Sequence, residues 1–310
     1  MKIEVFKYYF SSYYIFLLTI YIVHLSITYI CFMQFLKKTL KFYVFSNLHV
    51  ALAGFCFAKI TLLKFNNLEN VSAVFIAFSI VVSYNFIRFY ELKTNQLNLI
   101  KEWFVTHLKW LWLLTAFSGV GMLYILFFTD FNSSGLILLF PFLIMTIFYV
   151  IPLFKIKSVE VSFRNFPGIK IFSIGIAWSG VSVLFPLYEA GVEFTLNVYL
   201  EFIQRILILI VIVIPFDIRD VMSDSYSLKT LPQIIGVYGS KWLGSVLLII
   251  FVLLAICTKN TINEFLVRIF IAVVAALLLW FSSSERPRFY TSLLVESVPI
   301  FWLVLILLFS

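Results

Sequence analysis

Three carboxylates at the end of a long apolar run have the clearest capacity for chemistry. Asp217, Asp220 and Asp224 stand at positions i, i+3 and i+7, so on a helix they share one face. Neighbouring carboxylates about 6 Å apart repel by about 3 kcal/mol at an effective dielectric constant of about 20. Three ionised groups so placed require a bound cation, a bound proton or deep hydration. The alternative is a hydrated loop with scattered acids.

The composition places these carboxylates in a membrane protein. Of the 310 residues, 63% are hydrophobic and only 12% are charged. No polar stretch is long enough to form a soluble domain. The formal net charge is +8, but the bases stand in short connectors between apolar runs, which is typical of membrane topology and argues against a nucleic-acid partner. The three cysteines lie inside apolar runs, which indicates buried residues rather than metal ligands or disulfides.

The apolar runs predict an all-α polytopic membrane bundle of about nine transmembrane helices, preceded by one extra N-terminal apolar helix. The nine spans are expected near 45–64, 70–90, 108–128, 134–154, 169–188, 196–216, 242–258, 264–282 and 291–309. Basic residues, Lys170 among them, gather in every second connector and are interpreted mainly as topology-setting charges. The positive-inside rule therefore predicts an integral protein of the cell inner membrane, with the carboxylates facing the cytoplasm.

Residues 1–40 are predicted to be an extra segment, and residues 41–310 the transmembrane body. The run at 10–33 is long enough to span a membrane and has no small-residue cleavage site, which argues against a signal peptide. The sequence from Met33 onward is typical of a protein start. We therefore hypothesise that residues 1–32 come from a mis-set start codon.

At its second acidic stretch the body resembles the UbiA superfamily of intramembrane prenyltransferases. The resemblance covers roughly residues 40–310 and depends on the run RDVMSD at 219–224, followed by KTLP at 229–232. Family members have an RDxxxD run leading to a TLP element after the sixth span, and an NDxxDxxxD motif after the second. Asn85 matches the first Asn of that earlier motif. Its three acids are replaced here by Phe86, Phe89 and Lys93.

The resemblance implies transfer of an isoprenyl group from a prenyl diphosphate to an aromatic or lipid acceptor, with two Mg²⁺ ions between the motifs. Because the first motif lacks its acids, we expect one Mg²⁺ rather than two, bound by Asp217, Asp220 and Asp224. Arg88, whose planar guanidinium matches phosphate oxygens, would replace the second ion. The expected partners are membrane lipid, a prenyl diphosphate donor and an unidentified acceptor. The expected roles are catalysis by Asp220, Asp224 and Arg88, and substrate binding by Asn85, Arg88 and Lys229.

Other interpretations of the same residues stay open. Arg88 can instead pair with Asp217 or Asp220 and only close the mouth of the bundle. The chain can bind an isoprenoid or lipid diphosphate without turnover, or transport an ion or solute with the carboxylates as a coupling site. Transport ranks last, because no clear pair of spans is broken by Gly or Pro. Glu296 is a further site candidate inside the last span, while His49 is expected to be hydrogen-bonded within the bundle.

Overall fold

The computed structural model describes residues 29, 31–94, 100–150, 154–156, 159–161, 169–223, 229–258 and 261–309. The chain separates into two units, Met1–Phe45 and Ser46–Ser310. The described part of the first unit contains the helix Cys31–Phe45. Residues 1–28, which hold most of the predicted extra N-terminal segment, lie outside the described residues, and so does the candidate ligand Asp224.

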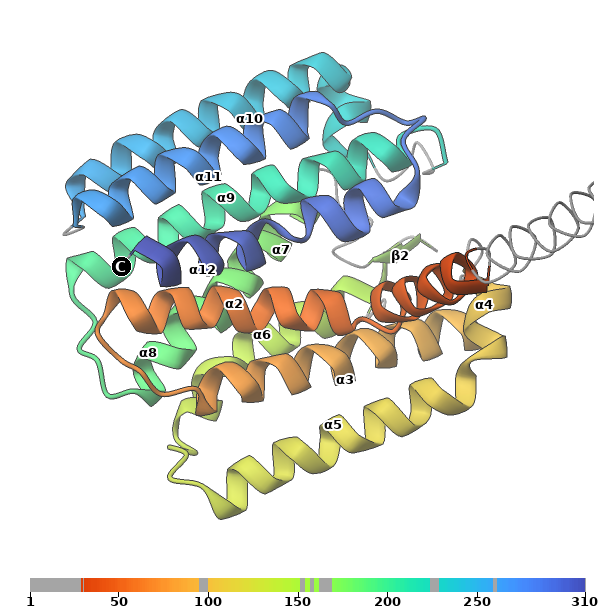
Figure 1. Ribbon diagram of the computed structural model, residues 1–310, viewed down its shortest axis with the longest axis horizontal. Helices are drawn as coiled ribbons and strands as arrows, with labels where there is room; N and C mark the ends of the chain where they lie inside the picture. Colours follow the sequence, from red (N-terminus) through yellow and green to blue (C-terminus); the bar gives the residue numbers. More distant parts are fainter. Residues whose placement is uncertain are drawn as a thin grey trace, which may run out of the picture. The chain divides into compact units, whose positions relative to one another are not determined.

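The second unit is a bundle of helices (Figure 1). The α-helices are α2 (Leu48–Lys64), α3 (Val71–Lys93), α4 (Lys101–Thr106), α5 (Leu108–Phe128), α6 (Gly135–Val150), α7 (Ile169–Ser179), α8 (Phe185–Glu189), α9 (Leu196–Asp220), α10 (Leu231–Cys257), α11 (Ile262–Trp280) and α12 (Val298–Phe309). There are also two π-helical turns in the described residues. The turn η2 (Gly180–Leu184) lies between α7 and α8, and η4 (Tyr290–Val295) precedes α12. A short antiparallel hairpin, β1 (Phe154–Ile156) with β2 (Val159–Val161), follows α6.

The prediction of an all-α polytopic membrane bundle is confirmed. Seven described helical segments are long and apolar enough to cross a membrane, or eight if Cys31–Phe45 and α2 form one span. Two of the nine predicted spans are not among the seven: α2, which counts only when joined to Cys31–Phe45, and α6, which has 16 residues and contains Pro141. At 1.5 Å per residue α6 is about 24 Å long, short of a hydrocarbon core of about 30 Å.

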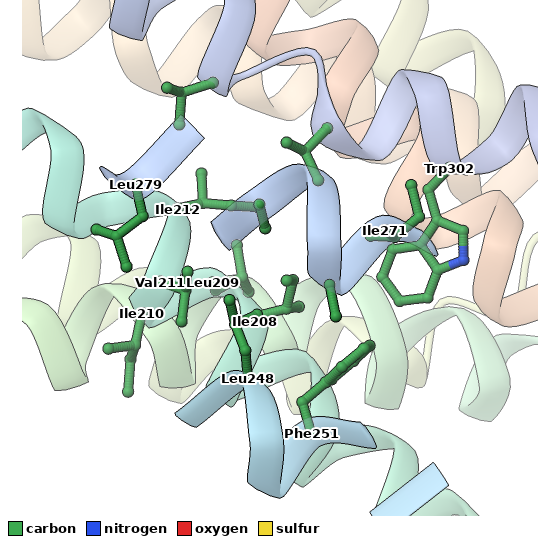
Figure 2. Packing of buried hydrophobic residues seen from close by; sticks show 14 of the residues in the cluster. Ile208, Leu209, Ile210, Val211, Ile212, Leu248, Phe251, Ile271, Leu279 and Trp302 are labelled. Carbon is green, nitrogen blue, oxygen red and sulfur yellow. The ribbon is translucent and has the colours of Figure 1, made fainter. Parts of the chain in front are cut away.

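Helix α9 forms the centre of the larger hydrophobic core. It packs against α7, α10 and α11, and Figure 1 shows α10 and α11 running side by side next to it. Figure 2 shows how the buried stretch Ile208–Ile212 of α9 meets side chains of the other helices: Leu248, Phe251, Ile271, Leu279 and Trp302. This packing holds the polar residues toward the two ends of α9 in place. Glu201 lies near the start of the helix, and Asp217 and Asp220 lie near its end.

Two glycines let neighbouring helices approach closely. A Cβ atom on Gly180 of η2 would overlap the ring of Phe142 on α6, and one on Gly244 of α10 would meet Leu279 of α11 at 2.5 Å. Small residues commonly have this role in membrane bundles, because association there depends on close van der Waals packing. These two positions therefore allow the close approach of η2 to α6 and of α10 to α11.

Candidate functional site

Asp217 is buried in the last turns of α9 and is bound to a base on another helix. Its side chain is only 3% exposed, and its Oδ1 atom lies 2.7 Å from Lys170 Nζ of α7. A carboxylate buried in an apolar environment needs a neutralising partner. Lys170 is therefore more than a topology-setting charge, because it compensates Asp217 and joins α7 to α9.

Asp220 forms a two-pronged ion pair with its neighbour in the sequence. Arg219 Nε donates to Asp220 Oδ1 at 2.7 Å, and Arg219 Nη2 donates to Oδ2 at 2.6 Å. The other terminal nitrogen, Nη1, donates to the hydroxyl of Thr291 in η4. The guanidinium also lies over the ring of Phe216, 5.3 Å from its centroid. Asp220 thus orients Arg219 toward the polar end of the last span.

Arg88, which stands among the remains of the first motif, pairs with an acid on its own helix. Arg88 Nη1 donates to Glu91 Oε2 at 2.8 Å, one turn along the same helix. The predicted alternative, in which Arg88 pairs with Asp217 or Asp220, is therefore wrong, because those acids are bound to Lys170 and Arg219.

Asn85 is fully buried and joins three helices. Its Oδ1 accepts a hydrogen bond from Asn47 Nδ2 at 2.8 Å, just before α2, and its Nδ2 donates to Thr115 Oγ1 of α5 at 3.0 Å. Both ends of the amide are thus engaged in helix packing. The geometry supports a positioning role for Asn85 in holding α3, whose last turns carry Arg88.

Arg88, Arg219 and Arg288, which we term the arginine cluster, come from α3, α9 and the segment before η4. Arg288 interacts electrostatically with both other arginines and with Asp220. Burial lowers the pKa of Arg288, and Arg219 and Arg88 lower it further, while Asp220 opposes the change. No hydrogen bond or ion pair joins the Arg288 guanidinium to the part of the chain that the structure describes. Its five N–H donors are therefore not engaged by the described residues.

Polar groups from α2 and the last span line the same end of the bundle. Glu296 follows η4, is partly buried and interacts electrostatically with Arg219 and Arg88. His49 Nε2 lies 3.0 Å from the carbonyl oxygen of Leu293 and 3.3 Å from Ser297 Oγ. The prediction that His49 is hydrogen-bonded within the bundle is confirmed. Glu296, singled out by its position inside a span, lies near the arginine cluster.

The KTLP element has a structural explanation at the start of α10. Thr230 is the N-cap residue, Pro232 lies in the first turn, and the Gln233 side chain accepts a hydrogen bond from Thr230 N at 2.9 Å. These are the residue types that begin helices. Lys229 precedes them, exposed and with a φ of 42°. No hydrogen bond or ion pair joins Lys229 to the described residues, so its predicted binding role stays a prediction.

The predicted magnesium site stays a prediction, because one of its three carboxylates lies outside the described residues. Asp217 and Asp220 are bound to different bases, and no group of three or more His, Cys, Asp or Glu residues that could hold a metal ion occurs among the described residues. Asp224 lies outside them.

Sequence reasoning also missed the roles of Lys170, Arg288 and Thr291 at this end of the bundle. The available signal for Arg288 was its place in a connector next to a polar span end, where Arg286 and Arg288 are the basic residues. Comparison with protein-family models, with curated proteins and with solved structures finds no match for this chain.

Proposed function

We propose that the chain binds the diphosphate head of an isoprenyl lipid at the arginine cluster and transfers the isoprenyl group to an acceptor. The observation that carries the proposal is that Arg288 interacts electrostatically with Arg219 and Arg88, at one end of an apolar helical bundle. Planar guanidinium groups bind phosphate oxygens through paired, charge-assisted hydrogen bonds. An isoprenyl tail matches the apolar environment of the adjoining helices, and the resemblance to the UbiA superfamily supplies the reaction.

In this reaction the bond between the isoprenyl carbon and the diphosphate oxygen breaks, and the diphosphate leaves with both electrons. The acceptor forms a new bond to the isoprenyl carbon, and the proton that it loses passes to water. The arginines contribute by stabilising the negative charge that develops on the leaving oxygens. Arg288 suits this role best, because its donors are not engaged by the described residues. Arg219 is held in place by Asp220 and Thr291.

Binding without turnover is the second candidate function, and one observation favours it. The two described acids of the motif, Asp217 and Asp220, are already neutralised by Lys170 and Arg219. A site whose acids only position bases can hold a lipid diphosphate without cleaving it. The two functions predict the same ligand and differ only in the release of diphosphate.

The test measures binding of radiolabelled farnesyl diphosphate to the purified chain in detergent. A charged hydrogen bond contributes about 1.5–3 kcal/mol, so Arg288→Gln is expected to weaken binding by about 10- to 150-fold. Arg286→Gln is the matched control, because Arg286 is exposed and its Nε donates to the carbonyl oxygen of Phe281. Equal losses in the two variants, or no binding by the wild type, would contradict the proposal.

Turnover is then measured as diphosphate release in the presence of a panel of aromatic and lipid acceptors, with and without Mg²⁺. Release by the wild type and its loss in Arg288→Gln support transfer. Tight binding without release from any acceptor supports the second function.

A further inference from the structure

A second group of charges lies about 24 Å along α9 from Asp217, toward the start of that helix. Glu201 is fully buried, and its carboxylate accepts hydrogen bonds from three bases. Lys64 Nζ and Arg268 Nη2 donate to Oε2 at 2.7 and 2.8 Å, and Arg205 Nη2 donates to Oε1 at 3.1 Å. We term these four residues the buried charge cluster. They join the end of α2 to α9 and α11.

The buried charge cluster has more positive than negative charge. Its most exposed side chain, that of Lys64, is only 7% exposed, and one carboxylate faces three cations. Glu264, in the first turn of α11, also interacts electrostatically with Lys64. With both acids counted and all three bases protonated, one positive charge remains uncompensated among the described residues. An uncompensated charge in an apolar interior is strongly unfavourable.

The two arginines are fixed where they are. Arg205 Nη1 donates to the carbonyl oxygen of Phe57 at 2.9 Å, and Arg205 Nη2 donates to Thr61 Oγ1 at 3.1 Å. The guanidinium carbons of Arg205 and Arg268 both lie over the ring of Trp302, 5.3 and 5.5 Å from its centroid. Cation–π contacts offset part of the cost of burying the charges. They do not supply a counter-charge.

An open hydrogen-bond donor lies within the same group of side chains. Gln204 is fully buried, and its Oε1 accepts a hydrogen bond from Arg268 Nη1. Its amide nitrogen Nε2 is buried without an acceptor in the described part of the chain, and so is Nε of Arg205. A buried N–H without an acceptor is unfavourable, and such groups usually bind water or an ion. The amide of Gln204 is thus a donor next to an excess of positive charge.

We propose that the buried charge cluster binds one small monovalent anion of the halide class, which accepts a hydrogen bond from Gln204 Nε2 beside Arg268. One negative charge equals the excess that remains after Glu201 and Glu264 are counted. A phosphate or sulfate ion would carry a second charge and more oxygens than the open donors can bind. The anion completes the neutralisation of the group that joins α2, α9 and α11.

The test uses the full chain, purified in detergent micelles, and chloride as the probe. Thermal unfolding is followed by tryptophan fluorescence in chloride, in bromide and in gluconate at equal ionic strength. An anion that binds only the folded state lowers the unfolding equilibrium constant by the factor 1 + [anion]/Kd. The midpoint is therefore expected to rise with the logarithm of chloride or bromide concentration and to stay constant in gluconate.

Gln204→Glu supplies the missing negative charge from the chain itself. This variant is expected to lose the chloride dependence, with a midpoint in gluconate at least equal to that of the wild type. Gln233→Glu is the matched control, because position 233 is at the start of α10 and Glu is a usual residue there in a capping box. It is expected to keep the chloride dependence of the wild type.

Replacing Glu201 by glutamine is expected to change the chloride dependence in the direction opposite to Gln204→Glu. Glu201→Gln adds one more uncompensated positive charge, so its midpoint is expected to respond more steeply to chloride than that of the wild type. A smaller response would overturn the proposal. An equal chloride dependence in Gln204→Glu and the wild type would overturn it too, because the ion would then act elsewhere. If Glu201→Gln does not fold, the Gln204→Glu comparison decides. A wild-type midpoint insensitive to chloride would also overturn the proposal and would leave water as the partner of Gln204.

Discussion

Replacing Asp220 by asparagine separates two roles for the acidic stretch. In the structure, both oxygens of Asp220 are bound to Arg219, at 2.7 and 2.6 Å. A diphosphate that binds Arg219 must therefore approach a carboxylate that repels it. The expected result of Asp220→Asn is tighter binding of farnesyl diphosphate, because this repulsion is removed while Arg219 keeps its bond to Thr291.

The size of the effect follows from the geometry. Two unit charges about 6 Å apart interact by about 3 kcal/mol at an effective dielectric constant of about 20. The Asp220 side chain is 28% exposed, so solvent screening reduces this value. We expect a gain of about 1 kcal/mol in binding free energy, which is about fivefold in Kd. The fold should persist, because a partly exposed ion pair contributes only about 0–1 kcal/mol to stability.

The assay is equilibrium binding of radiolabelled farnesyl diphosphate in detergent, with diphosphate release measured on the same samples. Asp130→Asn is the control, because Asp130 is exposed in a different connector. If Asp220 were a metal ligand or a catalytic group, Asp220→Asn would instead weaken Mg²⁺-dependent binding and abolish release. That result would refute the repulsive role of the Asp220 carboxylate and would favour the one-magnesium site that the sequence resemblance predicts.

Three further substitutions, one of them with a control, test the packing and the ion pairs by thermal or denaturant unfolding. Glu201→Gln should destabilise the fold by about 3–5 kcal/mol, because three buried bases lose their shared acid; Glu193→Gln, at an exposed position, should change the stability by under about 0.5 kcal/mol, and equal costs would contradict the role of burial. Gly180→Ala should cost about 1–3 kcal/mol, because the new methyl group would overlap the Phe142 ring; an unchanged midpoint would mean that α6 moves freely. Asp217→Asn should cost about 1.5–3 kcal/mol through loss of a charged hydrogen bond, and a neutral result would show that Lys170 is satisfied without it.

The helices of this protein follow closely from its sequence. Hydropathy places α5 at 108–128, as observed, and α3 within a few residues of its ends. Such agreement is expected, because about 20 consecutive apolar residues are a local property of the chain. The start of α10 is an exception. Thr230 and Pro232 begin that helix well before the predicted 242, and Gly236 then breaks it with a φ of 75°.

The partners of the charged residues were decided by the tertiary structure. Spacing along a helix predicts contacts one turn apart, such as that between Arg88 and Glu91. It does not reveal that Asp217 binds Lys170, 47 residues away, because this contact depends on how α7 packs against α9. The convergence of Arg288 with Arg219 also requires the bundle to be assembled.

The buried charge cluster shows the difference most clearly. Ionisable residues within or at the ends of spans were a signal in the sequence, because such residues are costly in a membrane and usually have a partner. The sequence by itself determined that Lys64, Glu201, Arg205 and Arg268 lie within or at the ends of apolar runs. Only the fold brought Lys64 to Glu201 across 137 residues, and Arg268 to the same carboxylate across 67. In an apolar interior a charge must bind the nearest opposite charge, and helix packing decides which one is nearest.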